Sequence, residues 1–150
     1  MRLTLSICPP ALIVWRSPSS PNKWGKAVGP VVILPSDAPA HLKAHELLHV
    51  WQWLSVSVLA LPLVWLYLYS DGLPMQLIGL AFFMDSALRW LCMPYVFRTE
   101  AAGYAVSVKH QPDDINRFAV ALSSSAYNTG KTAIECKALI LARVADGRWF

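Results

Sequence analysis

Short runs of apolar residues near the N-terminus predict three β-strands. Polar and apolar residues alternate over residues 3–7, and a second apolar run covers residues 11–15. A third run, rich in β-branched residues, covers residues 31–34 directly after a proline. Residues 17–29 carry prolines and glycines, which indicate a loop. The first 35 residues are therefore expected to form strands joined by a loop.

Beyond this region the pattern becomes helical. One helix is expected over residues 38–53, an apolar helical hairpin over residues 54–97, and further helices over residues 98–150. A chain of 150 residues is long enough to bury one core without disulfides or metals. The expected fold class is therefore α+β, mainly α, in a single domain that covers residues 1–150.

The apolar hairpin allows two interpretations. Its first run, Leu54–Tyr69, barely reaches the length that spans a bilayer, and its second run starts at Met75 and contains Asp85 and Arg89 at i,i+4 spacing. Lys and Arg flank the pair of runs, whereas the turn between them carries one acidic residue, as in a membrane hairpin with both ends in the cytoplasm. The other interpretation is a buried hairpin within a helical bundle, with the ion pair at its edge.

Composition favours a membrane or a large apolar interface. Hydrophobic residues make up 55% of the chain and charged residues 15%, and there are 7 tryptophans. The net charge of +4 is scattered, so no nucleic-acid partner is expected. Cys8, Cys92 and Cys136 lie far apart with no CxxC pair, so the sequence indicates neither a cysteine zinc site nor a redox motif. Prolines break the N-terminal apolar run early, so no cleavable signal peptide is expected.

The clearest chemical signal is an HExxH sequence formed by His45, Glu46 and His49. Residues at i and i+4 lie on the same face of a helix, so both imidazoles can reach one metal ion. Glu46 then lies beside that ion, where a carboxylate can accept a proton from a metal-bound water. The motif falls within the helix predicted over residues 38–53, which strengthens the prediction of a metal site.

A catalytic zinc site needs a third protein ligand. His41 lies eight residues before His49, about 12 Å along a helix, so these two histidines cannot share one ion. His110 is a candidate beside a proline at a helix end. Glu100 is favoured over His110, because small residues next to it would let its helix approach the HExxH helix closely. The alternative for Glu100 is a solvated charged edge.

These segments together resemble a known class of enzymes. The stretch from His45 to Gln52 (HELLHVWQ) and the later Arg98–Ala101 (RTEA) are similar to gluzincins, zinc metallopeptidases whose third ligand is a glutamate on a later helix. Small zinc peptidases of this kind are often phage-borne or secretion-associated. The resemblance, mainly over residues 31–53 and 95–109, implies that zinc is bound by His45, His49 and Glu100 and that Glu46 acts as the base.

The chain also departs from the gluzincin pattern. Many members place an aspartate four residues after the glutamate, where this chain has Tyr104. Tyr104 is a candidate catalytic residue, because its hydroxyl could contact a metal ligand or donate a hydrogen bond to an oxyanion. The alternative is that its ring only packs against neighbouring side chains. If Glu100 is instead aligned with the aspartate of the gluzincin pattern, Val96 falls at the position of the third ligand. The metal would then have too few ligands. The resemblance also implies that residues 31–34 form an edge strand that binds an extended substrate. The alternative is that these residues form a core strand.

Two functions are therefore expected from the sequence. The first is a zinc-dependent peptidase-like protein that hydrolyses a peptide or protein substrate through a metal-activated water. The alternative is a non-catalytic structural or assembly protein, a membrane or phage virion component that keeps a zinc-stabilised fold. The expected location is a membrane with cytoplasmic chain ends, or a phage particle.

Overall fold

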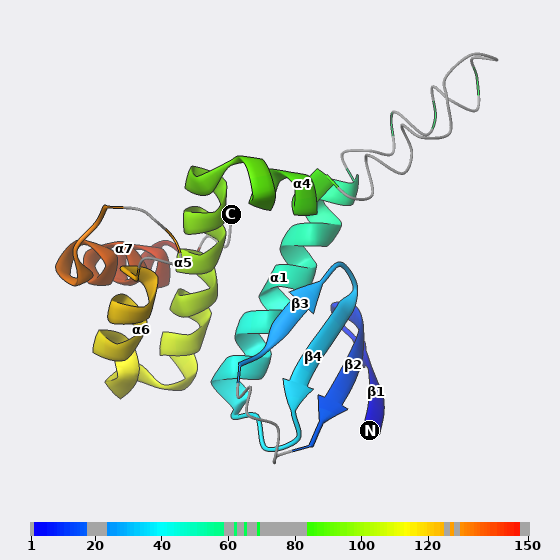
Figure 1. Cartoon of the computed structure of the whole chain (residues 1–150), viewed down its shortest axis with the longest axis horizontal. Coiled ribbons are helices and arrows are strands. Elements are labelled where there is room, and N and C mark those ends of the chain that lie inside the picture. The colour runs from blue at the N-terminus through cyan, green and yellow to red at the C-terminus, as the bar shows by residue number, and fades with distance from the viewer. Residues whose placement is uncertain are drawn as a thin grey trace.

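The protein is described by a computed structural model that covers residues 2–17, 24–58, 84–124 and 130–147, together with the single residues 62, 65, 69 and 127. The fold is α+β and mainly helical, with the strands preceding the helices, as the sequence predicts. A four-stranded sheet packs on one side of a long helix, and shorter helices gather on the other side of that helix (Figure 1).

The sheet has the strand order β1-β2-β4-β3. β1 (Arg2–Ile7) is antiparallel to β2 (Pro10–Arg16), β2 is parallel to β4 (Val31–Pro35), and β3 (Lys26–Val28) is antiparallel to β4. The three predicted strands are confirmed as β1, β2 and β4.

Two predictions about this region are wrong. β3 lies within the segment predicted as loop, because a three-residue run is too short to show a period and forms only by pairing with β4. Residues 31–34, considered as an edge strand, lie in β4 between β2 and β3, so the core-strand alternative holds and the sheet edges are β1 and β3.

The inner face of the sheet packs on helix α1 (Ala40–Val58). The buried cluster between them contains alternate residues of β2 and β4 and one residue of the helix: Ala11, Ile13, Val32, Leu34 and Val50. Alternation along each strand therefore directs one set of side chains into this core and the other set to the opposite face of the sheet. The HExxH helix is thereby anchored on a rigid layer.

A second core joins helices α5 (Met93–His110), α6 (Ile115–Leu122) and α7 (Ala133–Asp146), with a short 3-10 turn, η1 (Pro112–Asp114), before α6. Its buried residues include Phe97, Phe118, Leu122, Cys136 and Ile140. The small residues Ala101, Ala102 and Ala105 of α5 are fully buried. α5 also packs along α1.

The expected hairpin has different boundaries in the structure. α1 continues to Val58, five residues beyond the expected end at residue 53, and residues 93–97 belong to α5 rather than to the hairpin. Helix α4 (Met84–Leu91) carries the predicted Asp85–Arg89 ion pair, with 3.1 Å between Arg89 Nε and Asp85 Oδ2. Most of residues 59–83 lie outside the described residues. Within the described parts of the chain, no helix combines the length and apolar character that crossing a membrane requires.

Candidate metal centre

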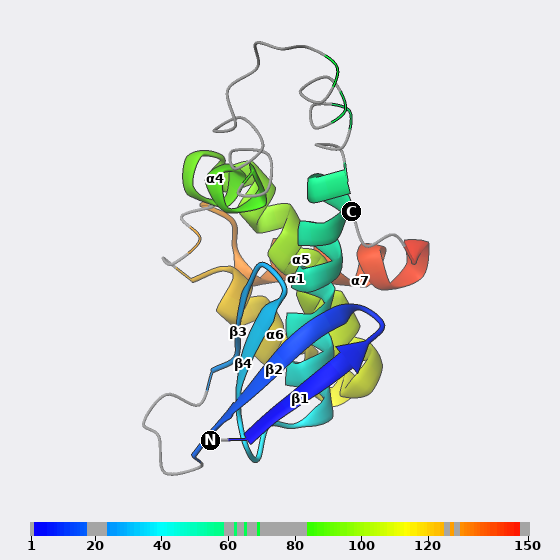
Figure 2. The ribbon, with the colours of Figure 1, turned by 90° about the vertical axis from the view of Figure 1, so that its right-hand side faces the viewer.

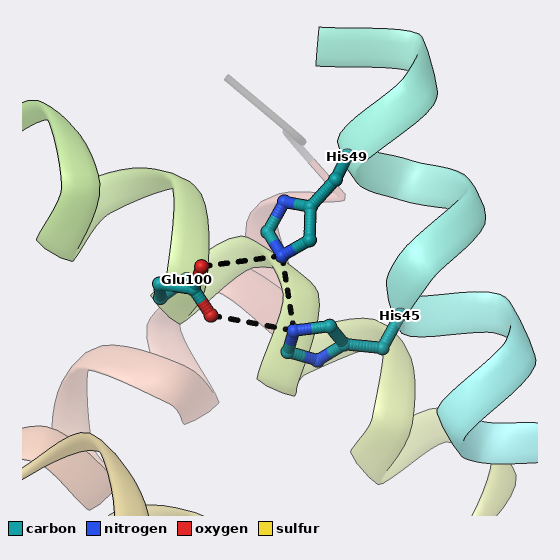
Figure 3. A group of neighbouring side chains, drawn as sticks. All are labelled: His45, His49 and Glu100. Atoms are coloured by element: carbon teal, nitrogen blue, oxygen red, sulfur yellow. Dashed lines mark hydrogen bonds and ion pairs between the residues drawn. The ribbon is translucent and has the colours of Figure 1, made fainter. Parts of the chain in front are cut away.

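Three side chains meet between α1 and α5 (Figure 3). His45 and His49 extend from one face of α1 toward Glu100 on α5. The two Nε2 atoms are 3.1 Å apart, and each lies 3.3 Å from a different carboxylate oxygen of Glu100. The ligand atoms of all three residues lie within 4.8 Å of one another, a group that could hold a metal ion.

The spacing of these atoms is close to that of donor atoms around a single metal ion. With bonds of about 2.0–2.1 Å and tetrahedral angles, two donor atoms on one zinc stand about 3.3–3.4 Å apart. The contacts of 3.1 and 3.3 Å match this edge length. Two imidazoles and one carboxylate are also the donor set of many catalytic zinc sites, in which a fourth position stays open.

The other candidate ligands lie outside this group. His41 stands in the first turn of α1 with its ring centroid 5.6 Å from that of Phe118, and burial lowers its pKa. His110 ends α5 and is exposed. The Glu100 side chain is only 14% exposed, so it does not form a solvated edge. Because both Glu100 oxygens face the histidines, the geometry gives no support to the register with Val96 at the ligand position.

Each histidine has a polar partner on its second ring nitrogen. His49 Nδ1 lies 2.8 Å from Gln52 Oε1, and His45 Nδ1 lies 3.4 Å from Ser107 Oγ. When Nδ1 donates to such an oxygen, Nε2 keeps the lone pair that a metal requires. Gln52 is in turn held by a hydrogen bond from its amide nitrogen to Thr99 O, at 3.3 Å. Gln52 and Ser107 thus stand beside the second ring nitrogens of the two histidines, whereas Tyr104 occupies the position of the aspartate in the gluzincin pattern.

A charged network supports Glu100 from the side of α4. Arg89 Nη1 donates to Glu100 Oε1 at 3.3 Å, while Arg89 Nε pairs with Asp85. Asp85 is buried and also accepts a hydrogen bond from Tyr95. Arg89 Nη2 lies 3.2 Å from Gln52 Oε1 and 2.9 Å from His49 Nδ1, so with Nδ1 protonated it donates to the amide oxygen. Arg89 is therefore fixed by Asp85 and reaches three groups of the site.

Two tyrosines complete the surroundings of the carboxylate. Tyr127 donates to Glu100 Oε2 at 3.3 Å, and its hydroxyl is 3.5 Å from that of Tyr104. The Tyr104 ring packs edge-on against His45, with 4.9 Å between centroids. Burial raises the pKa of both tyrosines, so both remain hydrogen-bond donors at neutral pH. The sequence analysis did not identify Tyr127, which contacts the candidate ligand Glu100. The catalytic role of Tyr104 stays a prediction.

The two glutamates of the site have opposite electrostatic environments. Burial alone would raise the pKa of Glu100, but the His49 charge and the hydrogen bonds to both histidines hold this pKa well below its usual value. Burial raises the pKa of Glu46, although His45 and a hydrogen bond from the backbone of Ala27 oppose this rise. Glu100 is therefore suited to bind a cation, and Glu46 is suited to hold and release a proton.

Two glycines make room for these side chains. A Cβ atom on Gly103 would lie 2.6–2.9 Å from three atoms of the His45 ring, closer than any real contact. A Cβ on Gly25 would lie equally close to the side chain of Glu46. Gly103 allows α5 to approach the first histidine, and Gly25 allows the start of β3 to approach the glutamate.

The three candidate ligands line a cavity of about 670 Å³. Glu46, Arg89, Tyr104, Ser107 and Tyr127 also line it, and Trp24–Ala27 form one wall. This volume is in the range of small-molecule and peptide side-chain sites. A metal held by the three residues would therefore be reached through a cavity that also exposes a proton acceptor.

Comparisons with known protein families, with curated proteins and with solved structures find no match for this chain.

Proposed function

We propose that this protein is a zinc-dependent peptidase. One observation carries the proposal: the group His45, His49 and Glu100 and the carboxylate of Glu46 line the same cavity. Metal-assisted hydrolysis needs an ion with an open position and a nearby proton acceptor. Nitrogen and carboxylate donors at tetrahedral spacing favour zinc over magnesium or calcium, which prefer six or more oxygen ligands.

The residues divide the work of hydrolysis between them. His45, His49 and Glu100 hold the ion, which when bound supplies a Lewis acid for a water molecule and the substrate carbonyl. Glu46 accepts a proton from the water and later passes it to the leaving amine. The Tyr104 hydroxyl donates a hydrogen bond to the carbonyl oxygen of the substrate, on which negative charge develops during attack by water.

The edge of the sheet supports a peptide as substrate. β3 is an edge strand, and its residues Lys26 and Ala27 line the cavity. An extended peptide can add to such an edge through main-chain hydrogen bonds. The backbone of Ala27 also forms a hydrogen bond with Glu46, so the base lies beside the strand along which substrate would lie.

The test combines two substitutions with metal analysis. Glu46→Gln keeps the shape of the side chain and removes its basicity, so the variant is expected to retain one zinc per chain and to lose cleavage of a denatured protein substrate. His49→Ala is expected to lose both zinc and cleavage. His110→Ala is the matched control and should keep both, because its imidazole lies outside the site. Equal cleavage by Glu46→Gln and wild type would contradict the proposed role.

A structural or assembly role is the second candidate function. It is favoured by large exposed apolar residues on the sheet, such as Leu5 and Ile7, which suit a partner surface. In that case zinc would bind, but neither wild type nor Glu46→Gln would cleave any protein substrate.

A further inference from the structure

The face of the sheet that points away from α1 is apolar across all four strands. The pairing register aligns Leu5 of β1 with Leu12, Val31 and Val28 of the strands that follow across the sheet. The neighbouring row aligns Leu3 with Val14, Ile33 and Lys26. Side chains two residues apart share a face, so Ile7 belongs to it as well. We call this surface the outer face: Leu3, Leu5, Ile7, Leu12, Val14, Val28, Val31 and Ile33.

The outer face is open to solvent to an unusual degree. Ile7 is 91% exposed, Leu5 81%, Leu3 55% and Val28 51%. Figure 2 shows the sheet in front of α1 with no described element over it. We estimate that the patch exposes on the order of 600 Å², at the upper end of what monomeric proteins leave in water. A contiguous apolar patch of this size favours a binding surface.

The charges around this face select among binding partners. The four strands carry three basic residues, Arg2, Arg16 and Lys26, and no acidic residue. Lys26 stands within the rows of the outer face, and Arg16 follows Val14 by two positions on the same strand. A second copy docked on this face would bring like charges together. An anionic surface would instead attract them, because basic residues are drawn to the negative surface potential of an anionic bilayer.

We propose that the outer face docks on a lipid bilayer that contains anionic lipids. The apolar side chains enter the interfacial region, and Lys26 contacts lipid phosphates at its border, as in other peripheral proteins that combine apolar burial with basic charge. Arg16, whose Nη2 donates to Trp24 O, adds positive charge on the same side of the sheet. Trp24, which is 65% exposed, precedes β3 and suits the headgroup region. Since β3 belongs to the outer face and also lines the cavity, the cavity opens near the bilayer surface. The inference does not depend on metal or on catalysis.

Hydroxyl-radical footprinting of the full chain tests this docking one side chain at a time. The protein is mixed with vesicles of phosphatidylcholine, alone or with phosphatidylglycerol, and labelling is read by mass spectrometry. Leu5 and Ile7 are expected to be protected roughly fivefold or more by the anionic vesicles. Ile134 on α7 is as exposed as Leu5, at 81%, and is expected to keep its labelling. Salt of about 1 M, where the Debye length is about 3 Å, should reduce the protection.

Two substitutions that change the net charge equally separate a local effect at the outer face from a general effect of charge. Lys26→Glu should weaken the protection of Leu5 and Ile7, whereas Lys131→Glu, before α7, should leave it unchanged. Equal labelling of Leu5 and Ile7 with and without anionic vesicles would overturn the proposal. Protection that appears without lipid and grows with protein concentration would also overturn it, because that outcome assigns the face to a second copy.

Discussion

Replacing Gly103 with alanine should damage the metal centre although the substitution is normally favourable in a helix. Alanine is preferred over glycine in a helix interior by about 1 kcal/mol. At this position, however, the new Cβ would lie 2.6 Å from His45 Cε1, whereas ordinary contacts begin at 3.4 Å. Either the imidazole or the whole of α5 must therefore move by 0.8 Å.

The size of this movement sets the expected effect. Overpacking of a core costs about 1–3 kcal/mol, so the gain in helix propensity is cancelled or exceeded, and the free energy of unfolding should fall by up to about 2 kcal/mol. Metal binding should suffer more, because zinc–ligand distances tolerate changes of only about 0.2 Å. We expect zinc affinity to fall by roughly 100-fold or more, the upper range for residues that orient metal ligands.

Zinc competition against a chromophoric chelator and urea unfolding of the metal-free protein measure the two effects. Gly147→Ala is the matched control: it introduces the same methyl group at a left-handed residue with φ of 63°, with nothing within 4 Å. It should cost about 1 kcal/mol of stability and leave zinc affinity unchanged. Wild-type zinc affinity in Gly103→Ala would refute the inference that this glycine makes room for a metal ligand.

Two further predictions concern the third ligand and a helix cap. Glu100→Ala should lower zinc affinity steeply while His110→Ala leaves it nearly unchanged, as measured by elemental analysis after dialysis; the reverse order would reject Glu100. Glu135 closes a capping box with Thr132, and hydrogen bonds from the Thr132 backbone and side chain lower its pKa. Its stabilising effect is therefore present at neutral pH and lost as pH falls through the lowered pKa, so Glu135→Ala should lower the urea midpoint at pH 7 and progressively less as the pH is lowered.

The parts of the site that could be predicted are those set by spacing within one helix. His45 and His49 meet because they are four residues apart on α1, and Gln52 follows His49 by three, so the same reasoning could have identified it. Glu100 was within reach because small residues beside it indicate close helix packing. The long helices and three of the four strands follow from periodicity for the same local reason.

The missing parts depend on how separate segments pack. Ser107 contacts His45 only because of the register between α1 and α5, which no local pattern of either helix encodes. Tyr127 reaches Glu100 from the connection between α6 and α7. β3 is three residues long and exists by pairing with β4. Each of these is a tertiary contact, and single-sequence patterns describe local structure.

The Asp85–Arg89 ion pair, which the sequence predicts, has an additional contact in the fold because Arg89 also pairs with Glu100. Its pairing with Asp85 at i,i+4 follows from the sequence and would by itself contribute little at a surface. In the structure Asp85 is buried, and the same guanidinium reaches Glu100, so the pair holds a positive charge against a candidate metal ligand. Loss of Asp85 would leave Arg89 free to turn away and would weaken the orientation of Glu100. The Asp85–Arg89 ion pair is thereby part of the surroundings of the candidate metal centre.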